Sequence, residues 1–280
     1  MGEGSGGMVA MINIIRKNTL VFFLILTLVI SWLPWFTGGQ GIFVFGPSIA
    51  GVITIALVAG KEGLRDLVKR ALRWRVGLKW WLIALFLPCL LTMIALGGHL
   101  LLGAALPPFT FIKTQWYLLP VFFIITLVGG PLGEEFGWRG FALPELQKKW
   151  SPWLASVLLG LIWGLWHLPQ FFNTAAVHYE LGLARFPFYV LAEIGLAILM
   201  TWVYNKTSGS LLVGGLIYHN ADNFWGVVLL TSATMQGALA GESAGVDLRF
   251  WAISAAATTL AAVLVCIFTR GKLGSSWKEG

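Results

Sequence analysis

Three ionisable side chains stand close together in an apolar part of the chain, within the stretch VGGPLGEEFGWRGF at residues 128–141. Glu135 and Arg139 are four residues apart, so on a helix they share one face and can form an ion pair. Glu134 points about 100° away from that face and has no partner nearby in the sequence. A carboxylate left unpaired in apolar surroundings is suited to take a proton from water. The stretch therefore predicts a supporting or substrate-positioning pair, Glu135 and Arg139, beside a catalytic base, Glu134.

Two later stretches carry polar groups that could complete such a site. His167 lies in LIWGLWHLPQ and could share the activation of water with Glu134. His219 and Asn223 lie in IYHNADNF and are again four residues apart, so both can donate hydrogen bonds to one atom. That arrangement suits the oxyanion of a tetrahedral intermediate. Glu193, in YVLAEIGLA, has no obvious partner, and a structural role is favoured for it.

The three polar stretches are predicted to reach a common depth in the membrane. Glu134, His167 and His219 each lie 13 to 15 residues from the anchor residues at the cytoplasmic ends of their spans, which corresponds to roughly 20 Å along a helix. A single intramembrane histidine is more often an interhelical hydrogen-bonding group, but three sites at one level favour a functional site. The agreement requires the fourth helix to continue through EEFGWR. His99 and His178 are expected to lie nearer the outer side, away from this level.

The elements that must position these groups are membrane helices. The chain has 280 residues, of which 58% are hydrophobic and 11% charged, whereas soluble domains contain about a quarter charged residues. A spanning helix needs about 20 apolar residues. The sequence therefore predicts an all-α bundle of about eight transmembrane helices, forming one integral membrane domain over residues 1–280 and enclosing a cytoplasm-facing cavity. The predicted spans are 18–36, 42–60, 78–103, 116–143, 153–172, 186–204, 210–231 and 249–268.

The positive charges predict the orientation of the bundle. With the N-terminus in the cytoplasm, the cytoplasmic segments contain sixteen Lys and Arg, with Arg139 included, and the outer segments contain only Lys113, Arg185 and Arg249. Cytoplasmic loops of membrane proteins carry such an excess. We therefore expect an integral protein of the cell membrane with both termini in the cytoplasm. Membrane topology also explains the net charge of +7 better than a nucleic-acid partner does.

The stretches EEFGWR, WGLWH and HNADN, in this order, resemble the CAAX prenyl protease and bacteriocin-processing (CPBP, or Abi) family of intramembrane proteases. The resemblance covers about residues 120–226. It implies cleavage of a peptide bond within the membrane, and eukaryotic and archaeal members remove the last three residues of a prenylated CAAX sequence. It also implies that Glu134 and His167 activate water, that His219 and Asn223 stabilise the oxyanion, and that Glu135 and Arg139 position the substrate or support the site. One departure is Trp163, where the family usually has Phe.

Metal use is left open by the sequence. The family is often described as metalloproteases, and Glu134, His167 and His219 could together bind zinc. The His-Glu-x-x-His signature is absent, and a Glu/His pair can activate water without a metal. These observations favour a site with no tightly bound metal, with zinc as the alternative.

Two other functions compete with the protease hypothesis. A non-catalytic bacteriocin-immunity or regulatory membrane protein could share the same helices. A proton-coupled transporter could use Glu134, Glu193 and the histidines as a relay, although the sequence contains no internal repeat to support it. The partners expected for the protease are membrane lipids and a peptide or lipidated protein substrate. The sequence does not identify that substrate, whether it is prenylated, or the oligomeric state.

Overall fold

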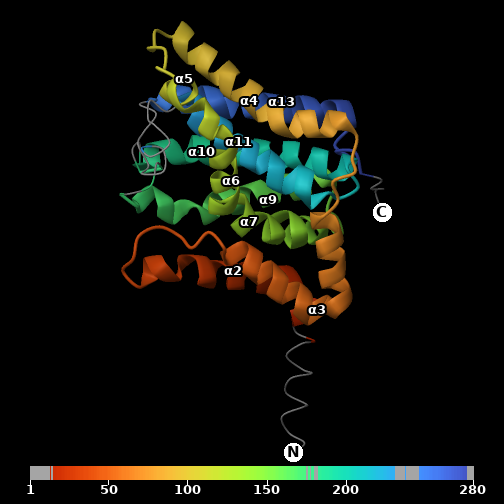
Figure 1. The fold of residues 1–280 in the computed structure, drawn as a ribbon. Helices are drawn as coiled ribbons and strands as arrows, with labels where there is room; N and C mark the ends of the chain where they lie inside the picture. The colour runs from red at the N-terminus through yellow and green to blue at the C-terminus, as the bar shows by residue number, and fades with distance from the viewer. Residues whose placement is uncertain are drawn as a thin grey trace, which may run out of the picture.

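The computed structural model describes residues 13, 15–174, 176, 178–179, 182–230, 237 and 246–275. Helices account for the regular structure in these ranges, so the predicted all-α bundle is confirmed (Figure 1). The α-helices are α2 (Thr19–Phe36), α3 (Gly46–Ala71), α4 (Leu78–Leu101), α5 (Thr110–Gln115), α6 (Leu119–Gly129), α7 (Pro131–Gly137), α8 (Leu143–Gln147), α9 (Pro152–Trp166), α10 (Gly182–Lys206), α11 (Tyr218–Leu230) and α13 (Leu248–Thr269).

Seven helical segments of the described chain are long and apolar enough to cross a membrane. They correspond to seven of the eight predicted spans. The remaining predicted span, 210–231, is helical but divided into a π-helical turn, η4 (Leu212–Ile217), and α11. A π turn holds more residues than an α turn and is frequent at functional sites.

The bounds predicted for the fourth span, 116–143, are wrong because the helix breaks at Gly130. The observed span is Thr110–Gly129, and Gly130 adopts the non-helical angles φ −146° and ψ −79°. Pro131 follows at the first position of α7, where its missing N–H and fixed φ are tolerated. Helical structure then continues through α7, the π turn η2 (Trp138–Ala142) and α8. Glu134 thus lies near the start of a new helix, rather than deep within a long one.

The long helices form layers around α10. α10 packs against α9 on one side and α13 on the other, while α3 packs against α2 and α7. Figure 1 shows α6 crossing the direction of these helices before the chain turns into α7. Large aromatic side chains fill the centre, among them Trp138, Trp163 and Trp166, each at most 2% exposed. The helices that carry the predicted site residues are therefore held by a tightly packed core.

The contact between α3 and α7 depends on a glycine next to the predicted site. A β-carbon at Gly137 would lie 2.2 Å from the carbonyl oxygen of Pro47, which is backbone and cannot move aside. We expect Gly137→Ala to lower the free energy of unfolding by about 1–3 kcal/mol, the usual range for overpacking.

The matched control is Gly97→Ala in α4, because a β-carbon there meets no atom within 4 Å. Alanine stabilises a helix by about 1 kcal/mol relative to glycine. The free energy of unfolding of this variant should therefore be unchanged or higher. Denaturant unfolding in detergent micelles measures both variants. Equal midpoints would contradict the close packing of α3 on α7.

Candidate active site

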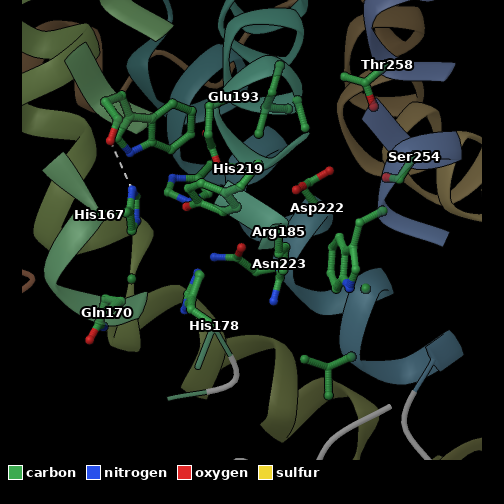
Figure 2. Close-up of a pocket in the computed structure, with 18 of the residues that line it drawn as sticks. His167, Gln170, His178, Arg185, Glu193, His219, Asp222, Asn223, Ser254 and Thr258 are labelled. Atoms are coloured by element: carbon green, nitrogen blue, oxygen red, sulfur yellow. Dashed lines mark hydrogen bonds between the residues drawn. The ribbon is translucent and has the colours of Figure 1, made fainter. Parts of the chain in front are cut away.

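A cavity with a volume of about 390 Å³ lies among α7, α9, α10, α11 and α13. Figure 2 shows polar side chains from several helices converging on it. Four predicted site residues line this cavity: Glu134, His167, His219 and Asn223. The structure thus brings together groups that are up to 89 residues apart in the sequence. The other two, Glu135 and Arg139, are fully buried in the wall behind.

The predicted ion pair in that wall is present. Arg139 Nη1 donates to Glu135 Oε1 at 2.7 Å, and neither side chain is exposed. The guanidinium also lies over the ring of Trp163, with Cζ 4.2 Å from the centroid, and Nη2 lies 3.2 Å from Met200 Sδ. Burial of two charges is tolerated only when each keeps close partners. The pair therefore holds α7 in place against α9 and α10.

Glu134 has a partner that the sequence did not reveal. The indole Nε1 of Trp163, on α9, donates to Glu134 Oε2 at 2.7 Å. A hydrogen bond to an ionised acceptor is short and strong, and it stabilises the charged carboxylate. One oxygen of Glu134 is thus held by the indole. Spacing places Trp163 on the same helix face as His167, four residues later, but it does not predict the contact with Glu134.

The hydrogen bond of His167 determines where its ring proton lies. Nδ1 is 3.0 Å from the carbonyl oxygen of Trp163 (dashed line in Figure 2). A carbonyl oxygen can only accept, so Nδ1 must carry the hydrogen. In the neutral ring, Nε2 then has a free lone pair and can accept a proton. His167 is therefore arranged as a base.

His219 is arranged for the opposite role. Its Nδ1 donates to Glu135 Oε1 at 2.9 Å, the same oxygen that accepts from Arg139. Its Nε2 can donate as well only when the ring carries both protons. A neighbouring carboxylate stabilises such an imidazolium, whereas the neutral carbonyl at His167 gives no comparable stabilisation. The two histidines therefore differ in the partner of Nδ1, which is a backbone carbonyl for His167 and a carboxylate for His219.

Gly130 keeps open the space between two of the site side chains. A β-carbon at this position would lie 3.3 Å from Asn223 Nδ2 and 3.7 Å from Glu134 Oε1. Both groups therefore border the break between α6 and α7. The carboxylate oxygen that Trp163 does not hold and the amide of Asn223 are thus on the same side of the cavity.

Several cavity residues were not predicted for the site. The expectation that His178 lies away from it is wrong, since its ring stacks on that of His167 with centroids 5.9 Å apart and it lines the cavity. Tyr189 packs edge-on against His167 at 5.3 Å. Glu193 and Asp222 also line the cavity. No local pattern marks His178, because it lies in the connection before α10 and reaches the site only through the fold. His99 instead lies 3.0 Å from Asp247, outside this cavity.

The donor set does not fit a zinc ion as it is arranged. Among the described residues, no three His, Cys, Asp or Glu side chains come close enough together to hold a metal. Glu134 and the two histidines line one cavity, but they do not form such a group. Zinc requires several ligand atoms at about 2 Å in a tetrahedral arrangement.

Comparison with known proteins agrees with the three motifs. Residues 115–225 match the family model described as type II CAAX prenyl endopeptidase Rce1-like. A relative named CAAX prenyl protease 2, from Methanococcus maripaludis, is 27% identical over 235 residues, which cover 75% of this chain and 84% of that protein. All six predicted site residues fall within the matched region. With the cavity that these residues form or support, the matches support a relationship of the chain to the CAAX prenyl protease and bacteriocin-processing family.

Proposed function

We propose that this chain is an intramembrane endopeptidase that hydrolyses a peptide bond with a water molecule activated by Glu134 and His167. The observation that carries the proposal is the convergence of Glu134, His167, His219 and Asn223 on one cavity. The hydrogen bonds on the histidines support a base role for His167 and a donor role for His219. The family match supports peptide-bond hydrolysis as the reaction.

The reaction follows from these assignments. Glu134, assisted by Nε2 of His167, takes a proton from water, and the hydroxide attacks the carbonyl carbon of the peptide. The oxyanion that forms accepts hydrogen bonds from Nε2 of the His219 imidazolium and from the amide of Asn223. When the C–N bond breaks, the proton passes from Glu134 to the leaving nitrogen. The products are a carboxylic acid and an amine.

The substrate is proposed to be a membrane-associated peptide or lipidated protein, and a prenylated CAAX tail is the first one to test. The relative's name supports that choice. Exposed Leu and Phe side chains on the outer helix faces, such as Phe86 and Phe268, are suited to contact membrane lipids. The protein is proposed to lie in the cell membrane with both termini in the cytoplasm.

The direct test is an assay of the purified protein in liposomes with a farnesylated CAAX peptide, with and without a chelator. Release of the terminal tripeptide, unaffected by chelation, is the expected result. Loss of cleavage that zinc restores would overturn the metal-free mechanism. Failure to cleave any prenylated or membrane-inserted peptide would favour a non-catalytic role.

The hydrogen bond from Trp163 to Glu134 gives a further test of the mechanism. Trp163→Phe keeps an aromatic ring against Arg139 but removes the donor. Hydrogen bonds to charged groups contribute about 1.5–3 kcal/mol, so kcat/KM should fall about 10- to 100-fold.

Trp166→Phe is the matched control, because Trp166 is equally buried and its Nε1 has no hydrogen-bond partner among the described residues. Its kcat/KM should change by less than about threefold, as expected for a small repacking. If the two variants lost equal activity, the loss would reflect packing rather than the carboxylate contact.

A further inference from the structure

The Lys- and Arg-bearing connections gather at one end of the bundle, which we name the basic end: segments 72–77, 148–151, 207–211 and 270–275. Ser210 Oγ donates to the carbonyl oxygen of Arg73 at 2.6 Å. The N–H of Trp153 donates to the carbonyl oxygen of Gly271 at 3.3 Å. Gly274 packs against the side chain of Lys206. These contacts join the four segments into one surface, at the side of Figure 1 where α3 and α13 end.

The remaining connections gather at the opposite end: segments 37–45, 102–109, 173–174 and 246–247. Thr174 Oγ1 donates to Gln40 Oε1 at 3.0 Å. Arg249 Nη1 donates to the carbonyl oxygen of Leu102 at 3.3 Å. The first residue of α2 and the last residue of α13 lie at the basic end, so both described chain ends are on the far side from these segments.

The cavity reaches the opposite end and not the basic end. Its lining includes Ile42, Val44 and Val246, which belong to segments of the opposite end, and His178, in the connection that precedes α10. The cavity extends well inside the bundle, since Glu193 also lines it and lies 11 residues after Gly182 on α10, about 17 Å at 1.5 Å per residue.

Towards the basic end the cavity is closed by packed side chains. Leu67, Arg139, Met200 and Leu211 form a layer in which no side chain is more than 3% exposed. Arg139 Nη2 lies 3.2 Å from Met200 Sδ, and Gly140 packs against Leu67 and Leu211. A peptide coming from the basic end would have to displace this layer and the buried ion pair within it.

The charge distribution decides which end faces the cytoplasm. The four segments of the basic end contain six Lys and Arg, and the four segments of the opposite end contain none. Cytoplasmic segments carry this excess. A cytoplasm-facing cavity is therefore incompatible with a cytoplasmic basic end, since the cavity and the ends of the described chain lie on opposite sides.

We infer that the cavity opens to the non-cytoplasmic side of the membrane. Resting on the proposed protease function, this inference also defines the substrate class: a membrane-inserted peptide whose cleaved bond lies in the outer leaflet. A prenylated tail made in the cytoplasm would approach from the closed end, so the farnesylated peptide of the liposome assay tests hydrolysis and does not represent the native substrate.

The sidedness can be measured without any assay of cleavage. In a chain whose two cysteines, Cys89 and Cys266, are replaced by Ala, single cysteines are introduced as Val44→Cys in the cavity lining and Thr174→Cys at the exposed opposite end. Glu62→Cys, exposed on α3 beside the basic end, is the matched control. Spheroplasts of a bacterial host are treated with a membrane-impermeant maleimide before and after permeabilisation.

Labelling of Thr174→Cys in intact spheroplasts, with Glu62→Cys labelled only after permeabilisation, is the expected result. The reverse pattern would overturn the inference and would leave the proposed hydrolysis untouched. Val44→Cys connects sidedness to the cavity: maleimide added to intact spheroplasts should label it and block cleavage of a membrane-inserted peptide. Labelling of Val44→Cys only after permeabilisation would show that the cavity opens to the cytoplasm.

Discussion

Replacement of Glu134 by Gln is expected to abolish peptide cleavage while the protein still inserts and folds. The amide has nearly the shape of the carboxylate and can still accept from the indole of Trp163, but it cannot take a proton from water. General-base catalysis contributes about 10²- to 10⁴-fold, so kcat should fall by at least about 10²-fold. Release of product from a membrane peptide, measured in liposomes at saturating substrate, gives this value.

Glu193→Gln is the matched control for that loss. Glu193 is another buried carboxyl group that lines the same cavity, and its exposed fraction of 8% is close to the 4% of Glu134. The proposed chemistry does not use it, so kcat should fall by less than about tenfold, a small part of the general-base contribution. Full activity of Glu134→Gln would refute the assignment of the base.

The largest effect on stability is expected from Arg139→Met. The substitution leaves the carboxylate of Glu135 buried without its guanidinium partner, and breaking a buried pair in this way costs about 3–5 kcal/mol. The double variant Glu135→Gln/Arg139→Met should regain much of that stability, because it removes both charges. Denaturant unfolding in detergent micelles measures the single and double variants.

Lys148→Met tests the same type of change at the surface. Lys148 pairs with Glu145 at 2.5 Å, but its side chain is 66% exposed. Exposed ion pairs contribute about 0–1 kcal/mol, so the midpoint of unfolding should barely move. If Arg139→Met lost no more unfolding free energy than Lys148→Met, the result would contradict the view that the buried pair holds the site together.

The polar half of the site could be predicted from spacing within helices. Glu135 and Arg139 are four residues apart and pair in the structure. His219 and Asn223 are also four residues apart, and both line the cavity. These relations are local, so the period of the helix is enough to establish them. The approximate places of seven of the eight predicted membrane helices followed for the same reason, because apolar length is a local property of the sequence.

The remaining features depend on contacts between distant segments or on rules of backbone conformation. Trp163 donates to a residue 29 positions earlier, and no periodicity predicts that contact. His178 reaches His167 from a connecting segment outside the helices. The break at Gly130 could have been anticipated, because a proline disfavours helical conformation in the residue before it. The predicted span was continued past this proline because the hydrophobic run extends to residue 143.

The two π turns, η2 and η4, have a consequence for comparing relatives of this chain. Both directly adjoin helices that carry site residues, α7 and α11. Such a turn holds one residue more than an α turn, and its loss would rotate one side of the helix relative to the other by about 100°. A single-residue gap in an alignment at 138–142 or 212–217 would therefore signal a reoriented Glu134 or His219. It should not be counted as a harmless difference in length.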